Sequence, residues 1–274
     1  MSGVDLHIHT NASDGRFSPE EIVRKSVELG LSIISITDHD TVDGVIPALE
    51  TAKDFHELKV IPGVEISTDV STGEVHVLGY FIDYENDELL GKLMKMRNSR
   101  LDRARKMVEK LRSLGVVIEW ERVREIAGDS SIGRPHIAQA MFEKGYIKSF
   151  KEAFNRYIGW GGPAYVSREK LTPAEAVELI LKADGLPVLA HPLTIDEPEK
   201  VIVELIKYGL IGIEAFYHDS NAEDITRMVK VAEKHNLVTT GGTDYHGLDN
   251  STETMLGGVD VPMESVEKLM ALKK

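Results

Sequence analysis

The stretch Val4-Asp5-Leu6-His7-Ile8-His9 alternates apolar and ionisable residues near the start of the chain. Side chains on a β-strand point alternately to opposite faces, so the pattern predicts a strand with Asp5, His7 and His9 on one face. Burying three ionisable groups together is costly unless a partner compensates them, and a bound cation does so most effectively. A solvated edge strand with its polar face in water is the alternative interpretation.

Residues of the same chemical types recur along the chain, at or beside other predicted strands. They are His39 after 31–37, Glu65 after 60–64, His76 within 74–78, His191 after 186–190, and Asp244 and His246 after 237–243. A single histidine is more often hydrogen-bonded than bound to a metal. Repetition at equivalent positions favours one shared site at the C-terminal ends of the strands, where α/β folds collect active-site residues.

Strand and helix signals alternate and predict an α/β fold. Ser18-Pro19-Glu20-Glu21 and Thr172-Pro173-Ala174-Glu175 each combine a capping residue, a first-turn proline and a glutamate that completes a capping box. The other expected elements are strands 31–37, 60–66, 74–82, 186–190, 211–216 and 237–243, and helices 44–58, 197–208 and 222–235. Together with the N-terminal stretch this makes seven strands, typical of a barrel or a doubly wound parallel sheet.

Residues 85–170 interrupt this alternation. They contain no convincing strand and are rich in helix formers, so we expect a helical insertion, or cap, lying over the C-terminal face of a unit made of 1–84 and 171–274. Within the insertion, Pro135 favours a helix that begins near Gly133. Arg134 and His136 would then lie at a helix N-terminus, which favours an anion. A plain helix start with an exposed arginine is the alternative.

Composition narrows the classes of protein and site. The 274 residues are 42% hydrophobic and 28% charged, as in ordinary globular proteins. The absence of cysteine excludes disulfides and thiolate ligands, so any metal must be held by His, Asp and Glu. No secretory signal pattern and no apolar stretch long enough to cross a bilayer is present, so we expect a cytoplasmic protein without a membrane partner.

The charge pattern bears on the partner. A formal net charge of −13 argues against binding to a nucleic-acid duplex. Residues 92–112 are basic in contrast to the acidic chain as a whole, because this segment contains nine Lys and Arg and only two acidic residues. This segment is either a solvated helix or a basic wall for an anionic substrate.

Nine side chains are candidate metal ligands. They are His7, His9, Asp14, His39, Glu65, His76, His191, Asp244 and His246. A site with open positions uses about three or four protein ligands, so nine predict two or three divalent ions. Clustered ions activate water and bind the oxygens of a phosphoryl group during in-line attack. The chain has neither a Gly-rich loop followed by Lys-Ser/Thr nor a Gly-x-Ser-x-Gly elbow, which argues against a nucleoside triphosphatase and a serine hydrolase.

Seven motifs together resemble the polymerase and histidinol phosphatase (PHP) superfamily. They are Asp5-Leu6-His7-Ile8-His9-Thr10, Ser13-Asp14-Gly15, Thr37-Asp38-His39-Asp40-Thr41, Pro62-Gly63-Val64-Glu65, His76-Val77-Leu78-Gly79, Ala190-His191-Pro192 and Thr243-Asp244-Tyr245-His246-Gly247. Two segments of the insertion, Gly133–Ala138 and Pro163–Val166, resemble stand-alone members that act on nucleoside 3′,5′-bisphosphates and short 5′-phosphorylated RNA.

The resemblance implies a distorted (β/α)7 barrel with a trinuclear site. One ion would take His7, His9, Glu65 and Asp244, a second Glu65, His76 and His191, and a third Asp14, His39 and His246. Mn²⁺ is the expected metal, with Zn²⁺, Fe²⁺ or Mg²⁺ as alternatives. Glu65, His191 and Asp244 would carry catalysis, and Arg134 and His136 would hold the substrate phosphate.

We therefore expect a metal-dependent phosphoesterase that acts on a small phosphorylated substrate, a nucleotide. Histidinol-phosphate phosphatase is the main alternative enzyme, and a metal-dependent amidohydrolase is a further one. A non-catalytic PHP module that supports a polymerase belongs to another functional class. It is disfavoured because no polymerase region accompanies the motifs and every ligand position is filled.

Overall fold

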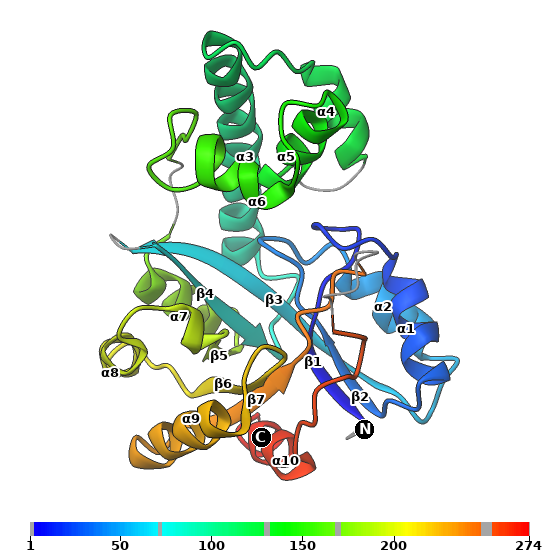
Figure 1. Cartoon of the computed structure of the whole chain (residues 1–274). Coiled ribbons are helices and arrows are strands. Elements are labelled where there is room, and N and C mark those ends of the chain that lie inside the picture. The colour runs from blue at the N-terminus through cyan, green and yellow to red at the C-terminus, as the bar shows by residue number, and fades with distance from the viewer. Residues whose placement is uncertain (1–2, 71–72, 129–131, 168–170, 248–253, 274) are drawn as a thin grey trace. The chain divides into compact units, whose positions relative to one another are not determined.

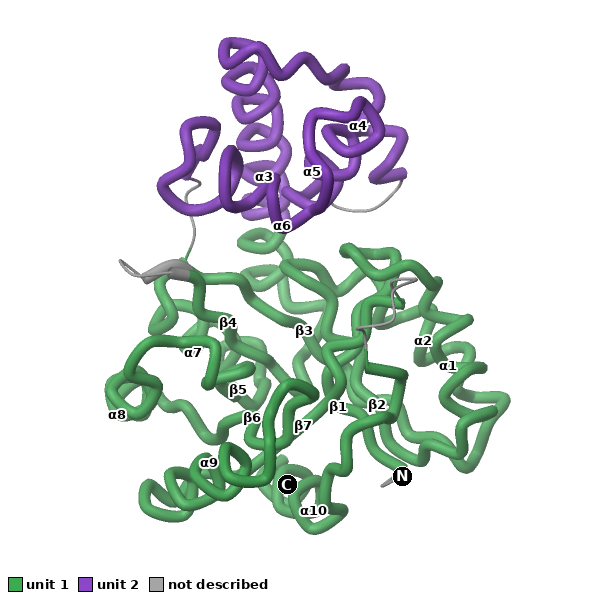
Figure 2. The backbone as a smooth tube through the Cα atoms, viewed as in Figure 1, with its two compact units in different colours: residues 1–93, 170–274 green, residues 94–169 purple. Residues whose placement is uncertain are grey.

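The computed structural model describes residues 3–70, 73–128, 132–167, 171–247 and 254–273. The chain divides into two compact units, 1–93 with 170–274, and 94–169 (Figure 2). The division falls inside the long helix α3 (Asp87–Ser113). The predicted end of the insertion at residue 170 lies outside the described residues.

The first unit is built on a seven-stranded sheet whose spatial order follows the chain (Figure 1). The strands are β1 (Val4–Ile8), β2 (Ile33–Ile36), β3 (Lys59–Val70), β4 (Gly73–Tyr80), β5 (Leu186–Leu189), β6 (Gly212–Tyr217) and β7 (Val238–Gly242). A parallel bridge between Ile8 and Tyr245 brings the chain after β7 back to β1. The result is a distorted (β/α)7 barrel, as the family resemblance implies, and not the doubly wound sheet that the pattern of strands and helices also allowed.

Strand β4 departs from the expected parallel arrangement. It pairs antiparallel with both β3 and β5, while the other neighbours are parallel. Only residues 71 and 72 separate β3 from β4. A crossover between parallel strands needs a dozen or more residues, so this short connection requires an antiparallel hairpin.

The helices of this unit begin largely where the sequence indicates. They are α1 (Pro19–Glu28), α2 (Val45–Ala52), α7 (Pro173–Lys182), α8 (Pro198–Ile206), α9 (Ala222–Lys234) and α10 (Met263–Ala271), with a 3₁₀ turn at Pro192–Thr194. Both predicted capping boxes form, at Ser18 and at Thr172. Helix α2 ends at Ala52 rather than residue 58, and successive turns then bring buried Leu58 into the core before β3.

The core explains the N-terminal pattern. All five residues of β1 are buried, and its Ile8 packs with residues of β2, α1 and α2. Val4 and Leu6 belong to a second cluster that includes β3, β4, β5 and α10. On the opposite face, Asp5, His7 and the following His9 are fully buried as well, which excludes the solvated edge strand.

Within its described residues, the regular secondary structure of the second unit consists of helices and contains no strands. It contains the rest of α3, α4 (Trp120–Ala127), α5 (Arg134–Glu143), α6 (Phe150–Ala153) and a π-helical turn at Phe154–Ile158. These elements enclose their own core, in which Met107, Leu111, Ile137 and Met141 are fully buried. Among the described helices of the whole chain, none combines the length and apolar character needed to cross a bilayer.

Candidate metal centre

Six strands deliver the nine candidate ligands to one part of the first unit. His7 lies on β1, Glu65 on β3 and His76 on β4. The remaining ligands lie in the segments that follow β1, β2, β5 and β7; they are His9, Asp14, His39, His191, Asp244 and His246. Parallel strands end at the same edge of the barrel, so short extensions of these strands can converge.

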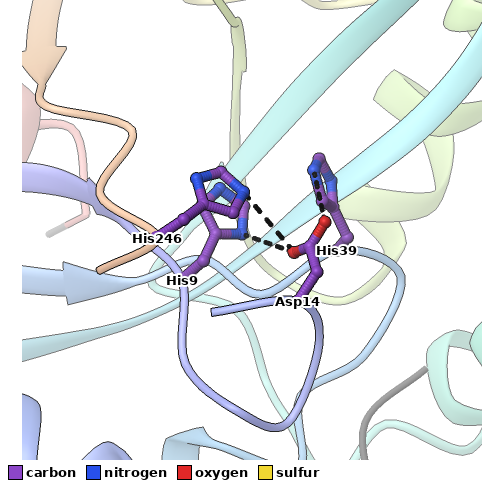
Figure 3. Close-up of side chains that lie close together, drawn as sticks. All are labelled: His9, Asp14, His39 and His246. Atoms are coloured by element: carbon purple, nitrogen blue, oxygen red, sulfur yellow. Dashed lines mark ion pairs between the residues drawn. The ribbon is translucent and has the colours of Figure 1, made fainter. Parts of the chain in front are cut away.

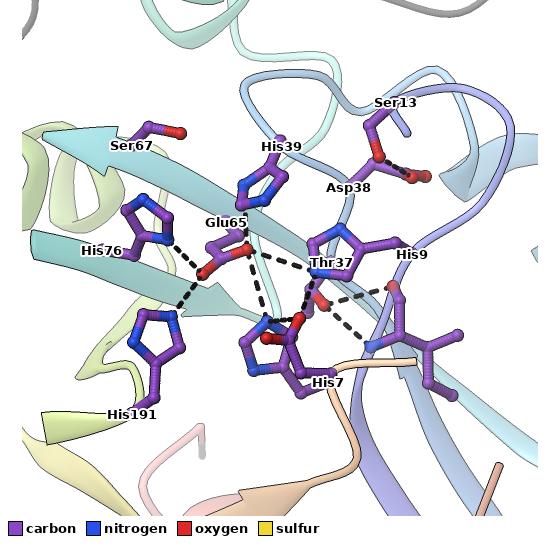
Figure 4. A network of polar contacts seen from close by, with 12 residues as sticks. His7, His9, Ser13, Thr37, Asp38, His39, Glu65, Ser67, His76 and His191 are labelled. Carbon is purple, nitrogen blue, oxygen red and sulfur yellow. Dashed lines mark hydrogen bonds and ion pairs between the residues drawn. The ribbon is translucent and has the colours of Figure 1, made fainter. Parts of the chain in front are cut away.

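Glu65 is the centre of this cluster (Figure 4). Its side chain is fully buried, and five imidazoles surround it. Glu65 Oε2 lies 3.3, 3.2 and 2.9 Å from nitrogens of His7, His9 and His39. Glu65 Oε1 lies 2.8 and 3.2 Å from nitrogens of His76 and His191. One carboxylate therefore faces both sides of the cluster.

Asp244 adds a second carboxylate beside the first two histidines. Its Oδ1 lies 3.3 Å from His7 Nε2 and 2.9 Å from His9 Nε2. The Tyr217 hydroxyl donates a hydrogen bond of 3.0 Å to Asp244 Oδ2. This bond orients the carboxylate so that Oδ1 remains directed at the imidazoles.

A third carboxylate, Asp14, belongs to the group in Figure 3. Asp14 Oδ1 lies 3.8 Å from His9 Nδ1 and 3.5 Å from His246 Nε2, and Oδ2 lies 4.0 Å from His39 Nε2. These separations exceed hydrogen-bond length. The four side chains converge without bonding one another tightly, which leaves room for a shared ligand.

The carboxylates and imidazoles shift one another's pKa strongly. Burial raises the pKa of Glu65, but the imidazoles of His39, His7 and His76 outweigh it and hold that pKa well below its usual value. Burial lowers the pKa of His9, but the negative charges of the Asp244 and Glu65 carboxylates beside its Nε2 reverse this and raise that pKa to about 10. Protons on imidazoles thus compensate the buried carboxylates, and a divalent cation competes with those protons for the same atoms.

The cluster passes a direct test of fit for divalent cations. Seven of its buried side-chain atoms have no hydrogen-bond partner of acceptable geometry within the described residues. They are His7 Nε2, His9 Nδ1 and Nε2, Asp14 Oδ1, His39 Nδ1, Glu65 Oε2 and Asp244 Oδ1. Ligand atoms that share one ion at roughly 2.1 Å lie about 3–3.5 Å apart, close to the separations above. Nitrogen and oxygen donors without sulfur suit Mn, Zn, Fe or Mg.

The donor atoms fall into three overlapping groups. One contains His7, His9, Glu65 and Asp244, the set that the resemblance implies for the first ion. Another joins Asp14, His39 and His246 with His9 in addition. The last group contains His39, Glu65 and His76. The resemblance implies Glu65, His76 and His191 for the second ion, so His39 takes the place of His191 in this group. His191 is nevertheless close by, because its Nε2 and the Nδ1 of His76 both contact Glu65 Oε1.

Glu214 is a buried supporting residue that the sequence analysis missed. Its Oε1 lies 2.9 Å from His7 Nδ1, and its Oε2 accepts a hydrogen bond of 2.8 Å from the backbone N–H of His191. A carboxylate behind a metal-binding histidine fixes the ring and its tautomer, so Nε2 of His7 is directed at Glu65. The available signal was a glutamate in the apolar strand Ile213-Glu214-Ala215, which burial makes costly without a partner.

Two further buried aspartates hold the loops that carry ligands. Asp5 shares a face with His7 in the sequence pattern, but it accepts hydrogen bonds from Thr243 N and Oγ1 and from Gly257 N. Asp38 likewise accepts from Thr10 N and Oγ1 and from Ser13 Oγ. Asp5 therefore serves as an anchor for the segment before Asp244, outside the three donor groups.

The backbone is unusual at two ligands. His191 has φ 27° and Asp244 has φ 52°, in the left-handed region that costs energy for residues with a Cβ. Close packing beside them also demands glycine, because a Cβ on Gly242 would lie 2.5 Å from the backbone nitrogen of His7. The backbone is therefore strained at the two residues whose side chains it directs toward the cluster.

Arg134 and His136 lie in the second unit, in the first turn of α5, as the sequence predicts. The Gly133 backbone N–H donates to His136 Nδ1 at 3.0 Å, which leaves Nε2 as the protonated nitrogen of a neutral ring. The Arg134 guanidinium carbon lies 5.4 Å from the centre of the Phe154 ring. Their role toward a substrate phosphate stays a prediction.

Comparisons with known proteins agree with this chemistry. Residues 5–105 match the model of the PHP domain family. The chain is 30% identical to the 3′,5′-nucleoside bisphosphate phosphatase of Chromobacterium violaceum, over 90% of this chain and 88% of that protein. It is 31% identical to the 5′-3′ exoribonuclease Rnm of Salmonella typhimurium, over 88% of this chain and 84% of that protein.

A solved structure gives the same result in three dimensions. A crystal structure from Bifidobacterium adolescentis, described as that of a metal-dependent phosphoesterase, superposes with a TM-score of 0.85 at 28% identity. The match covers 98% of this chain and 95% of that one. The buried His, Asp and Glu cluster, the barrel and these similarities lead to one conclusion: the chain belongs to the PHP family and is a metal-dependent phosphoesterase, a hydrolase.

Proposed function

We propose that this enzyme removes the 3′-phosphate of nucleoside 3′,5′-bisphosphates to give nucleoside 5′-monophosphates, and that it also acts on short 5′-phosphorylated RNA. The observation that carries the proposal is the buried cluster in which Glu65 and Asp244 meet five imidazoles. The names of the bisphosphate phosphatase and exoribonuclease relatives support a nucleotide as the substrate class.

The cluster would hold two or three divalent ions, with Mn²⁺ as the proposed metal. When bound, such ions supply a water of lowered pKa and neutralise phosphoryl oxygens. Glu65 presents one oxygen to each side of the cluster and would bridge two ions. Asp244, oriented by the Tyr217 hydroxyl, would hold an ion together with His7 and His9.

His191 completes the proposed catalytic set of Glu65, His191 and Asp244. Its Nε2 is directed at Glu65 Oε1, and its Nδ1 lies 3.1 Å from the Thr194 hydroxyl. The Thr194 hydroxyl and the hydrogen bond that the His191 backbone N–H donates to Glu214 together fix the imidazole ring. Held in this way, His191 can bind an ion or a phosphoryl oxygen without a costly rearrangement.

The substrate's other phosphate needs a separate ligand, and we assign that role to Arg134 and His136. Both lie at the N-terminus of α5, where backbone N–H groups and the helix dipole favour an anion. The guanidinium provides paired donors for phosphate oxygens, and His136 provides an Nε2–H.

Kinetics on three phosphate esters test this proposal. We expect a much higher kcat/KM for 3′-phosphoadenosine 5′-phosphate than for 5′-AMP or histidinol phosphate, because only the first carries two phosphates. Preference for histidinol phosphate would replace the proposed substrate class with the main alternative. Equal rates on all three esters would show that the second phosphate is not recognised.

A further inference from the structure

The two compact units carry opposite charge. Residues 94–169 contain 16 Lys and Arg against 9 Asp and Glu, a net charge of +7. The remaining residues contain 16 against 36, a net charge of −20, and the two values together give the chain's −13. The smaller unit thus holds half of the chain's Lys and Arg, 16 of 32, and such a charge asymmetry is typical of a protein that binds a polyanion with its basic part.

A continuous groove follows one side of α3 within this basic unit. Two hollows of about 560 and 450 Å³ share Lys106, Val166 and Ser167 in their walls. The first extends along α3 to Ser113 and the second extends to Lys95. At 1.5 Å per residue, this part of the helix is about 27 Å long. The groove is therefore long enough for several linked phosphates rather than one.

The wall opposite α3 is held in place by two basic side chains. The Arg103 Nε donates a hydrogen bond of 2.8 Å to the carbonyl oxygen of Val166. The Lys110 Nζ donates one of the same length to the carbonyl oxygen of Tyr165. These bonds fix the segment 165–167 against the helix, so the groove exists before any ligand arrives.

Two other lysines of the groove remain available to a ligand. Lys95 and Lys106 line it, and neither forms an ion pair with another described residue. They lie eleven positions apart, roughly 16 Å along the helix. Asp102 and Glu109 also line the groove and offset part of its positive charge, which comes from Lys95, Arg103, Lys106 and Lys110. Two lysines this far apart can contact separated phosphates of one chain, whereas a single phosphate cannot reach both.

The groove also offers neutral donors and an aromatic edge. Asn98, Ser99 and Ser167 are among its lining residues, and such side chains commonly bind phosphate and sugar oxygens. The Tyr165 ring borders the groove and lies 5.2 Å from that of Trp160, which is 57% exposed. Tyr165 itself is half-buried, and the Arg103 guanidinium carbon lies 5.2 Å from the centre of its ring, so Trp160 is the exposed ring of this pair. An exposed aromatic ring beside a basic groove is a usual platform for an unstacked base.

We propose that the α3 groove binds the sugar–phosphate backbone of single-stranded RNA, with Trp160 stacking on one of its bases. This inference deepens the proposed function, on which it rests for RNA as a substrate class, and it uses residues other than Arg134 and His136. A single strand is chosen because stacking on Trp160 needs bases whose faces are free, which a duplex does not offer.

Direct binding measurements test the groove independently of catalysis. The probe is an eight-nucleotide single-stranded RNA with phosphorothioate linkages and a 3′ fluorophore, followed by anisotropy on the metal-loaded full chain. The groove variant is Lys95→Ala with Lys106→Ala. The matched control is Lys148→Ala with Lys151→Ala, which removes two charges from the same unit at residues that do not line the groove. A third variant, Trp160→Ala, tests the stacking surface.

The groove variant should bind the RNA about tenfold more weakly, and its plot of log K against log salt should be shallower by about 1.4, the value for two lost phosphate contacts. The control should bind within about twofold of wild type, and both double variants should hydrolyse 3′-phosphoadenosine 5′-phosphate at the wild-type rate. Trp160→Ala should weaken RNA binding without changing the salt slope, because stacking is not ionic.

Unchanged RNA affinity in the groove variant would overturn the proposal, as would equal losses in the groove variant and the control. Equal affinity for a duplex of the same length would overturn the single-strand assignment. An enzyme that binds RNA in the groove but fails to hydrolyse the bisphosphate would contradict the proposed function and leave this inference standing.

Discussion

At the scale of single residues, the centre depends on carboxylates that touch histidines rather than on the candidate ligands alone. Glu214 lies between the apolar residues Ile213 and Ala215 of β6 and contacts both the His7 ring and the backbone N–H of His191. Without the Glu214 carboxylate, the ligands His7 and His191 would still be present, but the His7 ring and the His191 backbone would no longer be held in one orientation. Replacing a carboxylate that hydrogen-bonds a metal-binding histidine typically lowers metal affinity by roughly 10- to 100-fold.

We therefore expect Glu214→Gln to weaken metal binding about 10- to 100-fold while the fold persists, because an amide holds His7 less strongly than a carboxylate does. Metal titration followed by calorimetry measures the change. Glu204→Gln, at an exposed carboxylate on α8 that pairs with Lys207, is the matched control and should bind metal like wild type. Equal affinities for the Glu214 variant and the control would remove Glu214 from the centre.

The pKa directions predict how metal binding depends on pH. In the metal-free protein, His9 has a pKa raised to about 10, so it holds a proton at neutral pH that a metal must displace. Metal binding should then release protons, and the apparent affinity should rise between about pH 6 and pH 8. Titration in weakly buffered solution measures both effects. Proton uptake, or an affinity that falls with rising pH in this range, would contradict the assignment of His9 as a ligand.

At the scale of elements, helix starts were predictable because their signals are local. In the capping box of α1, Ser18 Oγ accepts from the Glu21 N–H, and the Glu21 carboxylate accepts from the Ser18 N–H. We expect Ser18→Ala to lower the free energy of unfolding by about 1 kcal/mol, since a backbone N–H loses its partner. Urea denaturation measures the change, and Ser18→Thr, which keeps the hydroxyl, is the control. Equal stability of the alanine and threonine variants would contradict the capping role.

The supporting contacts were not predictable in the same way, whereas the direction of β4 could have been predicted. The expected strands 60–66 and 74–82 leave seven residues between them, too few for a crossover between parallel strands, so these boundaries already required the antiparallel pairing that the structure has. Pairings such as Glu214 with His7 join residues far apart in the chain and depend on the closed barrel. The ligand-type residues themselves could be identified because charge beside an apolar strand is a local signal. The positive φ of His191 and Asp244 has no such signal in the sequence.

At the scale of the whole molecule, the first unit carries the cluster and the second carries the predicted phosphate ligands. Arg134→Ala should lower kcat/KM for 3′-phosphoadenosine 5′-phosphate by about 10- to 100-fold, the cost of a charge-assisted pair of hydrogen bonds. Metal content should stay the same, because Arg134 is not in a donor group. Arg156→Ala, at an exposed arginine of the same unit, is the control. Unchanged kinetics would leave Arg134 as part of a plain helix start with no role toward the substrate.

The number of ions per chain tests the central claim most directly. Elemental analysis of metal-reconstituted protein, with phosphate release measured on the same samples, should give two to three divalent ions per active chain, because three donor groups share the cluster. The Glu65→Gln variant should bind fewer ions and should lose phosphate release, since the substitution removes the negative charge that faces five imidazoles. One ion or fewer per chain in a fully active enzyme would contradict the account.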